Sequence, residues 1–205
     1  MADGIRTQMA YEYVTTHDAT DKRRAKAEGG VERRLTEAAV MLAVAIYILN
    51  HAESGTVRIH PDGEHAKRFD IPAWLAAAGF TLAKGIGSTS YGGAYVRGAE
   101  TVVVDPRPGL GDVEGEVDGR PVVVECKGGA INSSHAGQLS RLRRGLCEAI
   151  GLLLARAPDG AREIAAAPWT PTTAELARRL GPRCASAGIE IALVRPDGSI
   201  EWSAS

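Results

Sequence analysis

Two periods of hydrophobic residues run along this chain, and they predict different elements. From Val31 to Ala52 apolar residues recur at helical spacing and extend around most of the circumference, which predicts a buried helix. A second helical stripe predicts a helix from about His135 to Arg156. Two shorter helices are expected at Ile71–Ala78, which Gly79 ends, and at Thr170–Leu180, where a Thr-Pro pair marks the start.

Short runs rich in β-branched residues predict strands between these helices. They are Val57–His60, Phe80–Lys84, Ala94–Arg97, Thr101–Asp105, Ile164–Ala167, Ile189–Val194 and Ser199–Trp202. The first thirty residues are polar and charged, so we expect a flexible N-terminal arm over 1–30 and a single domain over 31–205.

The clearest local signal is a β-hairpin over Gly111–Lys127. Asp118-Gly119 is a typical two-residue turn between two strand-like runs, and this turn makes Val113 face Val124 and Asp112 face Glu125. Opposed residues share a face of the sheet, as do residues two apart along a strand. We therefore expect Asp112, Glu125 and Lys127 on one face. The residues expected on the opposite, core-forming face are Val113, Val122, Val124 and Cys126.

Two carboxylates opposed across a hairpin repel each other, so a partner is needed to neutralise them. Mg²⁺ takes oxygen ligands and is often held by one or two carboxylates together with substrate phosphate. Lys127, one pleat beyond Glu125, adds a positive charge beside an anionic substrate. The alternative is that these residues belong to a solvated face. The run Val122–Val124, apolar on both faces, instead predicts a covered central strand.

Composition narrows the classes of protein. The 205 residues include 24 basic and 25 acidic side chains, so no overall cationic field exists and any contact with nucleic acid must be local. The three cysteines are widely spaced and form no CxxC pair, which favours reduced thiols and a cytoplasmic location. The apolar run Ala38–Leu49 is too short for a membrane span, so no membrane partner is expected.

Asp112, twelve intervening residues and then Glu125-Cys126-Lys127 resemble the signature of the PD-(D/E)XK nuclease superfamily. Gly111 stands where that signature often has proline. The resemblance implies a restriction-endonuclease-like α/β fold with an αβββαβ core, in which a mixed central sheet is flanked by helices. The predicted order of elements over 31–168 matches this core.

The resemblance also implies a metal-dependent endonuclease that hydrolyses DNA phosphodiesters, in restriction, phage defence or repair. Asp112, Glu125 and the backbone carbonyl of Cys126 would hold Mg²⁺, for which Mn²⁺ could substitute. Lys127 would orient or help to deprotonate the attacking water and stabilise the charge that develops. Two alternatives stay open: an inactive binding or scaffold protein with the same fold, and an RNase.

Further residues are expected around this centre. Similar nucleases often carry a glutamine on the helix after the tripeptide, and Gln138 is the matching position. They often carry a glutamate on the first helix, where Glu32 and Glu37 are available, although the sequence favours a solvated face for both. Asp105 is a competing carboxylate outside the hairpin.

Contacts with nucleic acid are expected from two segments. Arg141 and Arg144 lie on the helix after the tripeptide, and Ser88 and Thr89 lie in a Gly/Ser/Thr loop between two strands. For each segment a solvated surface is the alternative. A homodimer that uses the apolar first helix is expected for cleavage of both DNA strands.

Overall fold

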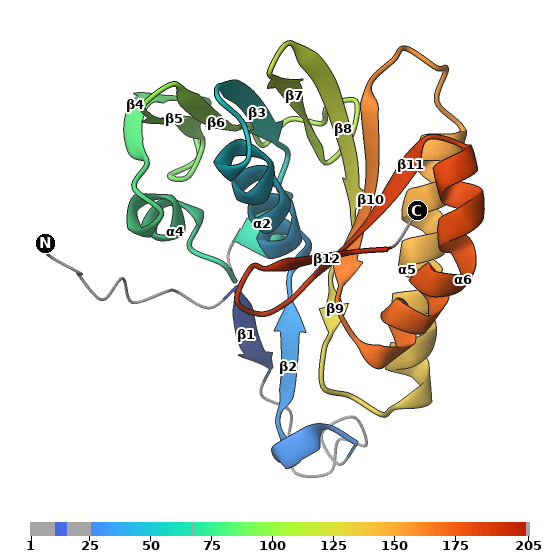
Figure 1. Ribbon diagram of the computed structural model, residues 1–205. Coiled ribbons are helices and arrows are strands. Elements are labelled where there is room, and N and C mark those ends of the chain that lie inside the picture. Colours follow the sequence, from blue (N-terminus) through green and yellow to red (C-terminus); the bar gives the residue numbers. More distant parts are fainter. Residues whose placement is uncertain (1–10, 16–25, 67, 204–205) are drawn as a thin grey trace, which may run out of the picture.

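A mixed β-sheet with helices on both faces forms the body of the protein (Figure 1). The computed structural model describes residues 11–15, 26–66 and 68–203. Within these residues the main sheet has nine strands. In order across the sheet they are β12 (Ile200–Trp202), β11 (Ile189–Val194), β10 (Arg162–Pro168), β8 (Arg120–Cys126), β7 (Val113–Val117), β3 (Gly55–Ile59), β6 (Glu100–Val104), β5 (Gly93–Arg97) and β4 (Thr81–Gly85). The predicted α/β class with a mixed, helix-flanked sheet is confirmed.

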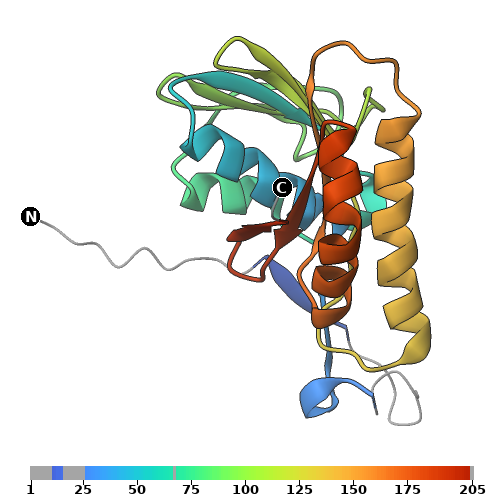
Figure 2. The same ribbon diagram turned by 45° about the vertical axis from the view of Figure 1, so that its right-hand side comes forward.

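The helices divide between the two faces of this sheet (Figure 2). Helices α2 (Glu37–Asn50) and α4 (Ile71–Ala77) lie on one face, whereas α5 (Ala136–Leu154) and α6 (Pro171–Ser186) lie on the other. Strand β8 is antiparallel to β7 and parallel to β10, and α5 forms the crossover connection that a parallel pair requires. Helix α6 continues past Pro182, although the sequence predicted its end at Leu180.

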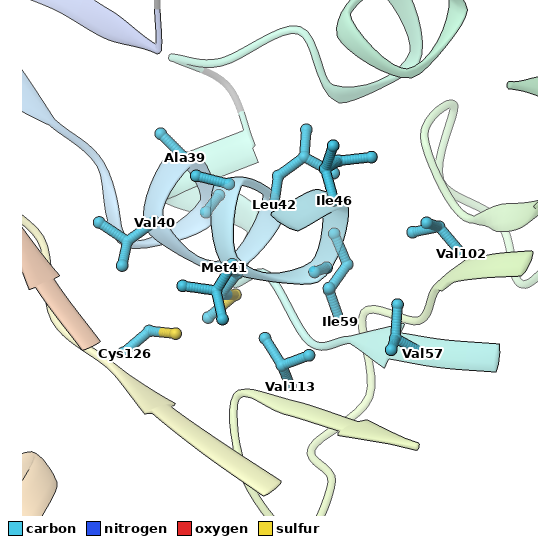
Figure 3. Close-up of a cluster of buried hydrophobic side chains, with 14 of the residues drawn as sticks. Ala39, Val40, Met41, Leu42, Ile46, Val57, Ile59, Val102, Val113 and Cys126 are labelled. Atoms are coloured by element: carbon cyan, nitrogen blue, oxygen red, sulfur yellow. The ribbon is translucent and has the colours of Figure 1, made fainter. Parts of the chain in front are cut away.

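Helix α2 is buried within a single chain. Eleven of its fourteen residues are buried, because the sheet covers one side and other parts of the chain cover the rest. Figure 3 shows Met41 and Leu42 of this helix above Ile59 and Val113 of the sheet. The predicted buried helix is thus confirmed. Its apolar circumference is explained by packing inside one chain, and the homodimer stays a prediction.

The helix begins later than its periodicity predicted. Residues Glu32–Leu35 form strand β2, and Thr36 is the N-cap, with Oγ1 accepting a hydrogen bond from the Ala39 amide at 2.9 Å. Strand β2 pairs with β1 (Glu12–Thr15) and with β9 (Gly129–Ala130) in a small second sheet. Pairing with these distant segments outweighs the local helical pattern.

Part of the expected N-terminal arm belongs to the fold. Tyr11 is 2% exposed and its ring lies 4.1 Å from that of Trp74, measured between ring centroids. Strand β1 follows it, and the short 3₁₀ helix η1 (Glu28–Gly30) leads into β2. Residues 1–10 and 16–25 of the predicted arm lie outside the described residues.

The β7–β8 hairpin has the predicted register. Val113 pairs with Val124 and Val117 with Arg120. Asp118 and Gly119 both have positive φ, 49° and 72°, as the type I′ turn requires. Asp118 is the one described non-glycine residue with positive φ, and its side chain accepts hydrogen bonds from two amides of the neighbouring α2–β3 turn.

The lengths of the helices and the state of the cysteines bear on two predictions from the sequence. Within the described residues no helix combines the length and the apolar character that a membrane span needs. Cys126, Cys147 and Cys184 are all free thiols. The short helix α3 (Gly63–Ala66) lies between β3 and α4 along the chain.

Candidate active site

The strand register gathers several loops at one end of the main sheet. A single row of paired residues crosses five strands at this end: Gly93, Val104, Ile59, Val113 and Val124. Asp112 stands just before this row and Glu125 just after it, and the loop between β4 and β5 also opens here. The predicted site residues of the hairpin therefore lie at the same end of the sheet as the Gly/Ser/Thr loop.

Asp112 is tied to the end of strand β8. Its Oδ2 accepts a hydrogen bond from the backbone N–H of Cys126 at 2.7 Å. Lys127 N–H donates to the Ala166 carbonyl on β10, and successive backbone groups of a strand point to opposite sides, so the N–H and C=O of Cys126 both point towards β7. The Asp112 carboxylate thus takes the place of a ladder acceptor at the point where β7 has not yet begun.

The two faces of β8 are as predicted. Val113, Val124 and Cys126 belong to the core beneath α2, whereas Val123 belongs to the core beneath α5. Glu125 and Lys127 alternate with the first set, so they lie on the α5 face.

Glu125 is the acidic neighbour of Asp112. Burial, and next the Asp112 carboxylate, raise the pKa of Glu125 to about 7. Gly111 allows this approach, because a Cβ at that position would lie 2.8 Å from Val123 Cγ1 and 3.4 Å from Glu125 Oε1. The close packing at this position therefore requires glycine.

Helix α5 packs against the side chain of Lys127. The Lys127 Nζ lies 3.3 Å from Glu148 Oε1, and a Cβ at Gly145 would lie 3.2 Å from Lys127 Cβ. Burial alone would lower the pKa of Lys127, but Glu37, Asp112 and Glu148 outweigh burial, so the pKa is raised. Lys127 is a fixed cation among carboxylates. Neither Gly145 nor Glu148 was predicted from the sequence.

Glu37 lies at this site instead of on the expected solvated face. It occupies the first turn of α2, and burial raises its pKa to about 7, with Lys127 opposing the rise and Asp112 adding to it. Gly128 brings the segment after β8 against this helix end, because a Cβ there would lie 2.6 Å from the Glu37 backbone nitrogen. The glycine pair after Lys127 was the available sequence signal.

Gln138 and Glu32 form a separate buried cluster. The Gln138 Nε2 donates to Glu32 Oε2 at 3.1 Å, and Arg34 Nη1 lies 2.8 Å from Glu32 Oε1. Glu32 is 0% exposed, so the solvated face expected for it is wrong. Gln138 precedes Gly145 by seven residues, about 10 Å along a helix axis, so the structure does not bring Gln138 to Lys127.

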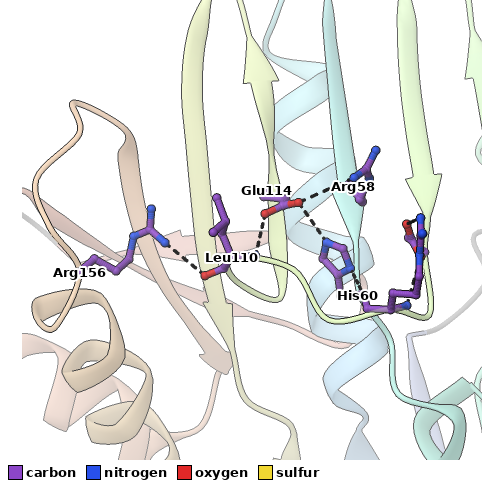
Figure 4. Close-up of polar contacts among 7 residues, drawn as sticks. Arg58, His60, Leu110, Glu114 and Arg156 are labelled. Carbon is purple, nitrogen blue, oxygen red and sulfur yellow. Dashed lines mark hydrogen bonds and ion pairs between the residues drawn. The ribbon is translucent and has the colours of Figure 1, made fainter.

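A polar network fixes the loop that delivers Asp112 (Figure 4). Glu114 Oε2 accepts from the Leu110 amide at 2.8 Å, and Arg156 Nη1 donates to the Leu110 carbonyl at 3.2 Å. The Nε2 atom of His60 lies 3.3 Å from Glu114 Oε1, and its Nδ1 forms a hydrogen bond with the Arg107 carbonyl. These contacts come from the residue after β3, from β7 and from the residue two beyond α5.

Asp105, the competing carboxylate, has a structural role. Its two oxygens receive three hydrogen bonds from Arg107, at 2.8 to 3.1 Å. The side-chain hydrogen bonds from Arg107 hold the pKa of Asp105 well below its usual range. Asp105 therefore stabilises the conformation of the β6–β7 loop.

The predicted nucleic-acid contacts lie in two places, on α5 beside Lys127 and in the β4–β5 loop at the same end of the sheet. Arg141 and Arg144 are exposed on α5, on the stripe that carries Gly145 and Glu148 at helical spacing, whereas Arg143 points to the other side of the helix. Ser88 is exposed. The Thr89 hydroxyl accepts from the Gly92 amide at 3.1 Å, which leaves its side chain engaged within the β4–β5 loop.

The donor set fits a hard divalent cation. Two adjacent carboxylates, one of them with a pKa raised by burial and next by its neighbour, and the carbonyl of Cys126 supply the oxygen ligands that Mg²⁺ takes. Within the described residues no group of three or more His, Cys, Asp and Glu side chains is placed to hold a metal. No family model, curated protein or solved structure matches this chain.

Proposed function

We propose that the protein is a metal-dependent endonuclease that hydrolyses DNA phosphodiester bonds. The observation that carries this proposal is the junction of β7, β8 and α5, where Asp112, Glu125 and Lys127 meet. An anionic pair beside a fixed cation suits a phosphodiester, which needs both a metal and a positive group near its oxygens.

The arrangement of elements supports a restriction-endonuclease-like core. Helix α2 is followed by β3, β7 and β8, which form a consecutive antiparallel run in the sheet, and then by α5 and the parallel strand β10. This order is αβββαβ when the segment 63–105, which contains β4, β5 and β6, is treated as an insertion.

Asp112, Glu125 and the Cys126 carbonyl are the groups that would hold Mg²⁺ or Mn²⁺. The bound ion would supply a polarised water and an electrophile for the phosphate oxygens. The pKa of Glu125, raised by burial and next by the Asp112 carboxylate, supports this assignment, because a cation would offset both effects.

Lys127 and Glu37 are assigned separate roles. The raised pKa of Lys127 favours the ammonium form, so this residue would stabilise charge on the phosphate rather than remove a proton from water. The Glu37 carboxyl has a pKa of about 7, which suits a group that accepts a proton at neutral pH. We assign the acceptance of the water proton to the Glu37 carboxylate.

The surface beside the site offers room for a duplex. Helices α5 and α6 cover only the β8, β10 and β11 side of their face, and Thr56 and Arg58 of β3 are exposed on the remainder. Arg141 and Arg144 line one border of the site and the β4–β5 loop lies at the same end of the sheet. These groups are assigned to phosphate contacts.

Incubation with supercoiled plasmid tests the proposal. We expect nicking or linearisation with Mg²⁺ or Mn²⁺, none with EDTA, and loss of cleavage in Lys127→Ala. Arg143→Ala is the matched control, since Arg143 is exposed on the opposite side of α5. Cleavage that survives in Lys127→Ala would overturn the residue assignment. Degradation of RNA but not DNA would indicate that the protein is an RNase. No cleavage of either polymer would favour a binding or scaffold protein.

A further inference from the structure

A pocket lies at the opposite end of the β7–β8 hairpin from the candidate active site. Its volume is about 610 Å³, within the range of small-molecule sites. It lies beside the Asp118-Gly119 turn and on the α2 face of the sheet, where Val117 and Val122 form part of its lining. Asp112 is one full strand away, about 17 Å, and Lys127 is on the other face.

Aromatic rings form one wall of this pocket. Tyr47 stacks on His51 with ring centroids 4.1 Å apart and lies 5.6 Å from Trp202, while Ile48 of the same helix adds apolar surface. Arg162 lies against Trp202, with its guanidinium carbon 5.2 Å from the ring centroid. Such walls accept a flat ring by stacking.

The charged side chains of the lining differ in how they are engaged. Asp118 accepts from the amides of Glu53 and Ser54 at 3.0 and 3.1 Å. Arg162 is joined to Glu190 by hydrogen bonds of 2.7 and 2.8 Å. The side chain of Arg120, also in the lining, makes no hydrogen bond or ion pair within the part of the chain that the structure describes. The oxygen Oδ1 of Asp118 is thus already engaged by backbone amides, and the guanidinium of Arg120 is the charged donor that stays available to a ligand.

The walls are fixed before any ligand arrives. The hairpin tip is joined to the α2–β3 turn by the two Asp118 contacts and by the Asp118 amide, which donates to the Ser54 carbonyl at 3.1 Å. Trp202 is held by the pairing of β12 with β11. Fixed walls lower the entropy cost of binding.

The geometry points to a binding site for a small planar aromatic anion of nucleoside monophosphate size. The base would stack on Trp202 and Tyr47, and the phosphate would receive hydrogen bonds from Arg120. This site is independent of the proposed nuclease centre, since it shares none of that centre's residues.

Calorimetric titration with adenosine 5′-monophosphate tests the site. We expect saturable binding tighter than about 1 mM, weakened about tenfold or more in Arg120→Ala and in Trp202→Leu. Arg120 is exposed, so its variant keeps the test valid if Trp202→Leu fails to fold. Lys127→Ala and Arg143→Ala should bind as wild type does.

Three results would overturn the proposal. The first is the absence of saturable binding by the wild-type protein. The second is an affinity for adenosine, or for inorganic phosphate, equal to that for adenosine 5′-monophosphate. Such a result would mean that either Arg120 or the aromatic wall does not contribute to binding. The third is loss of binding in Lys127→Ala with no change in Arg120→Ala, which would move the ligand to the other end of the sheet.

Discussion

Glu37→Gln should stabilise the protein at alkaline pH while it impairs the proposed reaction. A carboxyl whose folded-state pKa is raised binds its proton more tightly in the folded than in the unfolded state. Its effect on stability is therefore neutral below pH 4.5 and becomes a growing penalty as pH rises towards 7 and beyond. Gln is neutral and similar in shape, so the variant escapes the penalty.

The magnitude follows from the same shift. A change from 4.5 to about 7 corresponds to about 3 kcal/mol at about 1.4 kcal/mol per pKa unit, when the pH lies well above 7. Glu37 also lies in the first turn of α2, where a negative charge contributes about 0.5 kcal/mol through the helix dipole. We therefore expect a net gain of about 2.5 kcal/mol at pH 8.5 and about zero at pH 4.5.

Urea unfolding without divalent cations at these two pH values measures the difference. Glu116→Gln, on an exposed position of β7, is the control and should show no such change with pH. An equal effect of Glu37→Gln at both pH values, or destabilisation at pH 8.5, would refute the reasoning. If the effect is present, plasmid cleavage by this variant should nevertheless fall, because the proposed proton acceptor is gone.

Two further variants test how α5 is used. Gly145→Ala should keep its stability within about 1 kcal/mol of wild type, because alanine favours a helix interior, yet cleave DNA more slowly, since its Cβ would press on Lys127; unchanged cleavage would contradict the position given to Lys127. Gln138→Leu should lower the free energy of unfolding by about 1–3 kcal/mol, because buried Glu32 loses a donor. If the folded fraction of Gln138→Leu lost cleavage entirely, Gln138 would belong to the site after all.

The features predicted well from the sequence are those fixed by neighbouring residues. The β7–β8 register follows from the Asp118-Gly119 turn, and the faces of Val124 and Glu125 follow from strand alternation. The burial of α2 was likewise predicted from a local pattern, the apolar residues around its circumference.

The features that were missed depend on contacts between distant segments. Glu37 and Glu148 reach Lys127 only because glycines at 128 and 145 let α2 and α5 approach closely, and no spacing in the sequence reveals this. Residues Glu32–Leu35 carry a helical pattern but pair with β1 and β9. Gln138 is on the predicted helix, yet the buried carboxylate of Glu32 engages its amide.

Cleavage of plasmid DNA by Glu125→Gln across a range of Mg²⁺ concentrations tests the central claim most directly. The substitution keeps the shape of the side chain but removes the charge that would hold the metal beside Asp112. We predict a loss of at least about 100-fold that saturating Mg²⁺ does not restore, while Glu116→Gln cleaves as wild type does. Equal cleavage by Glu125→Gln and wild type would contradict a metal-dependent nuclease centre at this end of the sheet.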